Sequence, residues 1–234
     1  MGSQFTIGEG EGSRRFLSQT WRGKDYRRQP FRILVHGDSP YATDGLNSMD
    51  GWLRSTPDEL MRANIQLVKD AIEAYGNPGT KWNSLVWPAV VKVALGQMEE
   101  PAGAQFQEVF NRIAFNNYVH APMAASYCRP TAGQIAVAKE AYLQDLAELR
   151  PHLSIVLAKR VWNQLPTTGR HYCSALVGLK RRDMWVYTSS GHETLVGWLR
   201  HPSTVYRKSG WRNETEIEFA REYVRIASEF REAK

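Results

Sequence analysis

Apolar and polar positions recur along the chain with two different spacings, which predict a mixture of strands and helices. Short apolar runs, typical of buried strands, occupy residues 31–36, 109–115, 153–158, 184–187 and 194–200. Longer stretches place apolar residues three or four positions apart, as amphipathic helices do, over residues 57–76, 81–98, 131–150 and 213–230. A short helix is expected to follow the third strand and to reach Trp162, and the last two strands are expected to pair as a hairpin.

Capping residues predict where three of these helices begin. In each case a small polar residue precedes a Glu or Gln by three positions, so that each side chain can bind a backbone N–H group at the helix start. The pairs are Thr56 with Glu59, Thr131 with Gln134, and Asn213 with Glu216. Gly76 and Pro151 are expected to end the first two of these helices.

The order of the elements predicts the fold class. Strands that alternate with helices of this length favour a parallel sheet covered on both faces. We therefore expect an α/β fold: a single three-layer α/β/α domain with a mainly parallel central sheet of about four strands and an added antiparallel strand at 184–187. Residues 14–234 are expected to form this domain, and the Gly-rich residues 1–13 are expected to be a flexible N-terminus.

Composition narrows the class of protein. The chain has 234 residues, of which 42% are hydrophobic, enough for a sizeable core. Its longest apolar run is far shorter than the roughly 20 residues of a membrane span, and its first residues do not begin a secretory signal. We therefore expect no membrane association and a cytoplasmic location, nucleoid-associated in a bacterium. The two cysteines, Cys128 and Cys173, are expected to be reduced thiols, and they cannot supply the four thiolates of a zinc or iron–sulfur site.

Positive charge is concentrated in two segments. The net charge is +6, but residues 170–212 hold eight Lys or Arg against two acidic residues, and residues 14–32 hold seven against one. Since the rest of the chain is slightly acidic, this distribution indicates a one-sided electropositive surface of the kind that binds phosphates. Ordinary solvated surface charge is the alternative explanation.

Two polar stretches that follow predicted strands could carry chemistry. In Gly37-Asp38-Ser39-Pro40-Tyr41, the glycine permits close approach of a ligand, the proline stiffens the turn, and the acid could orient water or stabilise a cationic sugar. In Asn116-Asn117, the amide of Asn116 offers one acceptor and two donors, which could read the edge of a uracil-like base. An ordinary Asp-Ser-Pro turn and a polar strand end are the alternatives.

A third stretch begins at His201, directly after the last predicted strand. A positioned imidazole could stabilise negative charge on a departing base. The residues after it combine a hydroxyl that could bind phosphate, two apolar side chains that could wedge into a base stack, and two cations. In order, these are Ser203, Val205 with Tyr206, and Arg207 with Lys208. Loops that leave neighbouring parallel strands can meet at the carboxyl edge of the sheet.

Taken in order, these stretches resemble the motifs of the uracil-DNA glycosylase superfamily. Residues 31–41 resemble its motif A, a strand followed by Gly, an acid, a small residue and Pro, and residues 113–116 resemble its apolar strand ending in a base-reading Asn. Arg129-Pro130-Thr131 and residues 146–162 resemble its RPT … L..L.P..IV.L.K..W stretch. His201-Pro202-Ser203 resembles its motif B.

Motif A combines features of two branches of the superfamily. The best-known branch has Gly-Gln-Asp-Pro-Tyr, with its catalytic Asp where this chain has Ser39. Another branch has Gly-Glu-Ala-Pro-Gly, with its acid where Asp38 lies, but it usually carries four cysteines for an iron–sulfur cluster. Tyr41 matches the first branch, in which this residue walls off a 5-methyl group and disfavours thymine. Asp44 is a further candidate acid, and no subfamily is assigned.

The resemblance implies a monofunctional DNA glycosylase that flips uracil or a related base out of DNA and hydrolyses its N-glycosidic bond. Asp38 and His201 would be catalytic, and the base would be bound by Tyr41, Asn116 and Trp52. The DNA contacts would come from Ser39, Pro40, Ser203, Val205, Tyr206, Arg207 and Lys208. The expected partner is single- or double-stranded DNA bound by a monomer, and neither a metal nor a cofactor is expected.

Three alternatives stay open at this point. Ser39 and the doubled Asn116-Asn117 also fit a glycosylase for another base, such as a deaminated purine or a bulky modified pyrimidine of foreign (phage) DNA. Ser39 at the place of the catalytic acid fits a non-catalytic DNA-binding relative. A small-molecule α/β enzyme would require the two basic segments to be incidental.

Overall fold

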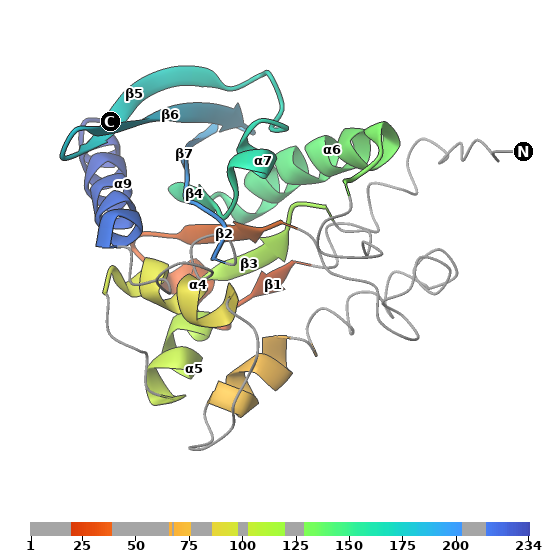
Figure 1. Ribbon diagram of the computed structural model, residues 1–234, viewed down its shortest axis with the longest axis vertical. Helices are drawn as coiled ribbons and strands as arrows, with labels where there is room; N and C mark the ends of the chain where they lie inside the picture. The colour runs from red at the N-terminus through yellow and green to blue at the C-terminus, as the bar shows by residue number, and fades with distance from the viewer. Residues whose placement is uncertain are drawn as a thin grey trace, which may run out of the picture.

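The computed structural model describes residues 20–38, 66, 68–75, 86–97, 103–119, 129–202 and 214–234. Over these residues the protein is an α/β fold, with helices packed against one seven-stranded mixed sheet (Figure 1). The predicted α/β class is confirmed. The predicted number of about four strands is wrong, because the sheet continues beyond its parallel centre on both sides.

The strands lie in the sheet in the order β1-β3-β2-β4-β7-β6-β5. They are β1 (Trp21–Arg22), β2 (Ile33–Gly37), β3 (Ala114–Asn117), β4 (Leu153–Val156), β5 (Arg170–Val177), β6 (Lys180–Ser189) and β7 (His192–Trp198). The helices are η1 (Tyr26–Arg28), α4 (Val86–Leu95), α5 (Gly103–Arg112), α6 (Ala132–Leu149), α7 (Lys159–Trp162) and α9 (Glu214–Glu232). Residues 66 and 68–75 are also helical.

The four central strands, β3, β2, β4 and β7, run parallel to one another. Val35 of β2, for example, lies opposite both Phe115 of β3 and Ile155 of β4. The outer strands reverse direction, since β1 is antiparallel to β3, β6 to β7, and β5 to β6. The carboxyl ends of four neighbouring strands therefore lie along one edge, where open α/β sheets bind their ligands.

Alternate residues of the central strands enter two separate cores. In β2, Val35 packs in the core that includes α4, α5 and α9, whereas Leu34 packs in the core that includes α6. Ile155 and Val156 of β4 divide in the same way. Figure 1 shows α6 on one side of β2 and β3, and α4 and α5 on the other. Because both faces are covered, these strands read as continuous apolar runs in the sequence.

Local signals predicted several element boundaries correctly. The capping box of α6 is confirmed: the Gln134 backbone N–H donates to the Thr131 hydroxyl at 3.2 Å, and the Gln134 side chain accepts from the Thr131 N–H at 2.8 Å. Arg150 ends this helix in the left-handed conformation, one residue before Pro151. The predicted hairpin is confirmed as β6 and β7, although β6 is longer than residues 184–187.

The strand predicted over residues 109–115 is wrong in its first half. Residues 103–112 form α5, and only 114–117 form β3. The apolar residues fit both spacings: Phe106, Val109 and Phe110 recur every three or four positions and are buried on one face of the helix. A run this short cannot be assigned from spacing alone when a helix and a strand follow each other directly.

Two strands at the borders of the sheet were not predicted. β1 has only two residues, and β5 begins with three exposed residues, so neither shows the apolar run expected of a buried strand. The predicted flexible residues 1–13, the helix start at Thr56 and the cap at Asn213 lie outside the described residues. Within the described part of the chain, no helix has the length and apolar character needed to cross a membrane.

Candidate functional site at the carboxyl edge of the sheet

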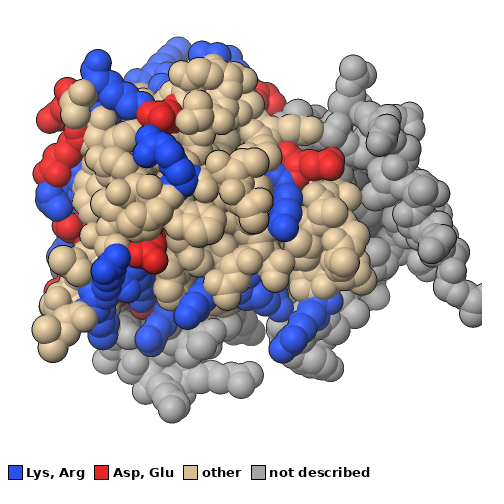
Figure 2. Space-filling model, turned by 90° about the horizontal axis from the view of Figure 1, so that it is seen from above, with Lys and Arg blue, Asp and Glu red and all other residues tan. Residues whose placement is uncertain are grey.

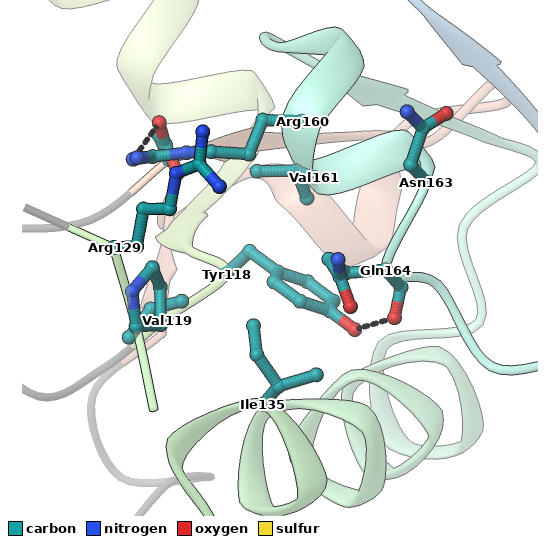
Figure 3. Close-up of a pocket in the computed structure, with 10 residues that line it drawn as sticks. Tyr118, Val119, Arg129, Ile135, Arg160, Val161, Asn163 and Gln164 are labelled. Carbon is teal, nitrogen blue, oxygen red and sulfur yellow. Dashed lines mark hydrogen bonds and ion pairs between the residues drawn. The ribbon is translucent and has the colours of Figure 1, made fainter. Parts of the chain in front are cut away.

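Asp38 lies directly after β2 and is almost completely buried, with 9% of its surface exposed. The ladder between β2 and β3 extends past the strand ends to reach it, since the Tyr118 N–H donates to the Gly37 carbonyl and the Val119 N–H donates to the Asp38 carbonyl, both at 3.0 Å. The Asp38 carboxylate forms an ion pair with the guanidinium of Arg160, which follows β4 on α7 (Figure 3). Asp38 is therefore fixed through both its backbone and its side chain.

His201 reaches the same region from the end of β7. Burial lowers the pKa of its imidazole below the ordinary value, the Arg160 charge lowers it further, and the Asp38 carboxylate opposes both effects. These interactions place Asp38, Arg160 and His201 within electrostatic reach of one another. The structure thus brings together the two residues that the sequence predicted to be catalytic, and the lowered pKa favours a neutral imidazole at neutral pH.

A cavity of about 380 Å³ opens beside Asp38. Its described lining residues are Asp38, Tyr118, Val119, Arg129, Pro130, Ile135, Arg160, Val161, Asn163 and Gln164. Figure 3 shows the guanidinium groups of Arg129 and Arg160 close together on one side and the Tyr118 ring in the centre, with Ile135 of α6 below it. This volume lies within the usual range for small-molecule sites, and a lining that combines apolar side chains with charged and amide groups suits a planar, polar ligand.

The Tyr118 ring lies in the wall of this cavity, and its hydroxyl group stays protonated. Burial raises its pKa well above the ordinary value, and its hydroxyl donates to the Gln164 carbonyl at 2.7 Å. The hydrogen bond ties the end of β3 to the segment after α7. The cavity wall is therefore built from two chain segments that are 46 residues apart.

Asn116 and Asn117 point to different surroundings. The Asn116 side chain is buried, donates to the Thr20 hydroxyl at 2.5 Å and to Asp145 at 3.2 Å, and accepts from the Asn117 N–H at 2.9 Å. In this arrangement its amide binds protein groups, and it is not among the described residues that line the cavity. The Asn117 side chain instead lies close to Gly37 of β2, because a Cβ atom added to Gly37 would be 2.4 Å from the Asn117 side-chain oxygen. Asn117, like Asn116, is not among the described residues that line the cavity.

Arg129 and Arg160 are site residues that sequence reasoning did not single out. Arg129 and Arg160 fall within stretches that resemble the superfamily, and Arg160 follows the end of β4 much as Asp38 follows the end of β2. Position after a parallel strand was the available signal. Most of the other predicted site residues lie outside the described part of the chain. They are Ser39, Pro40, Tyr41, Asp44, Trp52, Ser203, Val205, Tyr206, Arg207 and Lys208.

Charged side chains surround the site but do not form a uniform surface. In the described parts of the two basic segments, most cations are exposed, including Arg22, Lys180 and Arg200, whereas Arg182 is buried. Figure 2 shows Lys and Arg side chains on several parts of one face and in a row along its lower border, with Asp and Glu between others. Among the described residues, no group of three or more His, Cys, Asp or Glu side chains is arranged to hold a metal ion.

No protein-family model matches the chain, and no curated protein matches it. The resemblance to the uracil-DNA glycosylase superfamily therefore stands on the motifs alone. The structure adds an independent observation, which is the meeting of Asp38, Arg160 and His201 beside a cavity.

Proposed function

We propose that the protein is a DNA glycosylase that excises uracil, or a related damaged or modified base, by hydrolysis. The observation that carries this proposal is the convergence of Asp38 and His201 from the ends of two parallel strands, beside a cavity that could hold a flipped base. A carboxylate and a neutral imidazole at one site match the two charges that develop when an N-glycosidic bond breaks.

The proposed mechanism assigns one charge to each residue. As the bond lengthens, the sugar becomes cationic, and the Asp38 carboxylate stabilises it and positions the attacking water. The departing base becomes anionic, and the His201 imidazole N–H donates a hydrogen bond to its oxygen. Arg160 holds the Asp38 carboxylate in place through their ion pair. These steps need no redox or group-transfer cofactor.

The cavity supplies the binding side of the proposal. An extruded base would stack against the apolar and aromatic lining of Tyr118, Ile135 and Val161, as flipped bases do in enclosed pockets. Arg129, which lines the cavity, is a candidate to bind a backbone phosphate of the flipped nucleotide.

The first test measures base release directly. Labelled single- and double-stranded oligonucleotides that contain one uracil are incubated with the protein in EDTA and then treated with alkali. We expect cleavage at the uracil, and a loss on the order of 10²- to 10³-fold in rate for Asp38→Asn and for His201→Ala, as for other preorganised electrostatic groups. Glu148→Gln, an exposed change on α6, serves as the control. Metal-dependent strand cutting, or cleavage that survives both changes, would contradict the proposal.

A non-catalytic DNA-binding protein is the second candidate, and the Arg160–Asp38 ion pair favours it. A carboxylate that already faces a guanidinium stabilises a cationic sugar less strongly than a carboxylate without one. This candidate predicts salt-dependent DNA binding without release of any base from a panel of modified duplexes. The Arg160→Gln variant separates the two candidates, because a glycosylase changes its excision rate while a binding protein changes only its affinity.

A further inference from the structure

A buried ion pair joins β6 and α9 next to the end of β7. Arg182 donates from its two terminal nitrogens to the two carboxylate oxygens of Glu216, at 2.8 and 2.6 Å. The side chains are 6% and 1% exposed, respectively. Burying two charges costs several kcal/mol per ion, and an apolar pair of the same volume is often at least as stable. Its contacts with other groups therefore indicate what the pair contributes.

Both members of the pair also bind the backbone that leads to His201. Arg182 donates to the Trp198 carbonyl at 3.2 Å, and Glu216 accepts from the Arg200 N–H at 2.9 Å. An apolar pair could fill the same space, but it could neither donate to a carbonyl nor accept from an N–H group. The chain just before His201 is thus held at two backbone positions, 198 and 200.

Aromatic rings fix the guanidinium between β7 and α9. The Arg182 guanidinium lies 4.5 Å from the centre of the Trp198 ring and 4.0 Å from that of Phe219. The Tyr223 hydroxyl donates to the same Trp198 carbonyl at 2.7 Å. Because a guanidinium packed over aromatic faces keeps its orientation, the hydrogen bonds to residues 198 and 216 have little freedom to rearrange.

Glu216 also joins two points of the chain that are distant in sequence. Its bond to the Arg200 N–H links the end of β7 to the first turn of α9, 16 residues later. Lys180 adds a second tie to this turn, since its ammonium donates to the Thr215 hydroxyl at 3.1 Å. The end of β7, the start of β6 and the first turn of α9 are therefore joined by side-chain hydrogen bonds.

We propose that Arg182 and Glu216 are positioning residues for His201, which set the backbone that leaves β7 so that the imidazole faces Asp38 and Arg160. Neither residue is among the described residues that line the cavity, so they act through the strand end and not on a ligand. The catalytic meaning of this role rests on the proposed function. The placement of the imidazole does not rest on the proposed function, because it can be measured whether or not the protein has any activity.

The test follows the imidazole of His201 by NMR titration of the full chain, with His201→Ala identifying its signal. Burial lowers the pKa of His201, while Asp38 and Arg160 are the charged groups that act on it. In Arg182→Met we expect the imidazole to lose its fixed place and its pKa to rise toward the ordinary value of histidine. Glu216→Gln, which has the same shape, is the second variant if Arg182→Met does not fold.

Two controls separate positioning from general loss of stability. Leu146→Ala creates a cavity in the core under α6 and should lower stability while leaving the His201 titration unchanged. Arg181→Gln removes the neighbouring exposed cation and should also leave it unchanged. A His201 titration that stays the same in folded Arg182→Met and Glu216→Gln would overturn the proposal, as would an equal change in Leu146→Ala.

Base excision provides a second readout if the glycosylase proposal holds. We expect kcat to fall by up to about 10²-fold in Arg182→Met with a much smaller change in KM, because a misplaced imidazole affects the reacting bond and not DNA binding. Arg182→Lys should restore part of kcat, since it keeps a donor for Glu216. An unchanged kcat and pH profile would contradict the positioning role. If no base is excised by any form, only the proposed function fails, and the titration alone decides the positioning.

Discussion

Asp145 shows how one buried residue can make the fold sensitive to pH. Its carboxyl group, carried by α6, is buried, and its hydrogen-bond partners in the described chain, Thr20 and Asn116, carry no charge. Burial raises its pKa from 3.8 to about 7, while the two hydrogen bonds oppose the rise. Between these two pH values the folded protein retains a proton that the unfolded chain has lost. Stability should therefore decline as the pH rises through this window.

The variant Asp145→Asn should remove this decline, because an amide does not titrate. Relative to the wild type, its free energy of unfolding should improve by up to about 1.4 kcal/mol per pH unit as the pH rises from about 4 to about 7. Loss of one acceptor for Thr20 or Asn116 should lower its stability by a constant amount. Urea denaturation at several pH values measures the difference, with Glu140→Gln, at an exposed position of α6, as the control. Parallel curves for Asp145→Asn and the wild type would contradict the expectation.

Single residues of the site were predictable where a motif fixed their place and unpredictable where strand register did. Asp38 and His201 follow strands directly, so the sequence placed them at one edge. Whether the side chain of Asn116 or that of Asn117 faces α6 depends on the register of β3 on β2, in which Asn116 lies opposite His36 and Asn117 opposite Gly37. A shift by one residue exchanges the two faces of a strand, and no local signal reports it.

Among the elements, α6 connects local sequence to the site most directly. Thr131 and Gln134 cap the start of α6. Arg129, Pro130 and Ile135, which flank these two residues in the sequence, line the cavity. The box was predictable because both of its hydrogen bonds join residues only three positions apart. The boundary between α5 and β3 was not predictable from local sequence, because it depends on the face of the sheet against which Val109 and Phe110 pack.

Removal of the cap in Thr131→Ala should lower the free energy of unfolding by about 1 kcal/mol, since the Gln134 N–H loses its acceptor. Urea denaturation measures the loss, and Thr167→Ala, at an exposed turn position, is the matched control. The double variant with Gln134→Ala should cost less than the sum of the single changes, because the two side chains satisfy each other's backbone. Full additivity would show that the box does not act as a unit.

On the scale of the whole molecule, the sheet order was beyond the reach of sequence patterns. Strands β2 and β4, which are neighbours, are separated in the chain by β3 and α6, and β1 joins the far side of β3. The patterns indicated a parallel sheet because continuous apolar runs alternate with helices. They could not indicate which strands meet, because pairing is decided by long-range packing on both faces.

If the protein binds DNA as proposed, its affinity should depend on salt in a way that identifies the cations involved. If Arg129 contacts a phosphate near the cavity, Arg129→Gln should weaken binding for all sequences and reduce the slope of log K against log salt by about one. Arg225→Gln is the control, because Arg225 already forms ion pairs with Glu222 and Glu229 on α9. Fluorescence anisotropy over a range of salt concentrations measures both slopes. Equal slopes for Arg129→Gln and the wild type would exclude this contact.

The parallel centre of the sheet also governs when the site can form. The Asp38–Arg160 ion pair joins residues 122 positions apart, and His201 comes from a third segment still further along the chain. Contacts this distant require most of the chain to be ordered first, which makes folding slow compared with a helical protein of similar length. No short fragment of the chain holds a working copy of the site. Fragments that are cut between the strands and separated would each lack part of the site, even when each piece keeps its own helices.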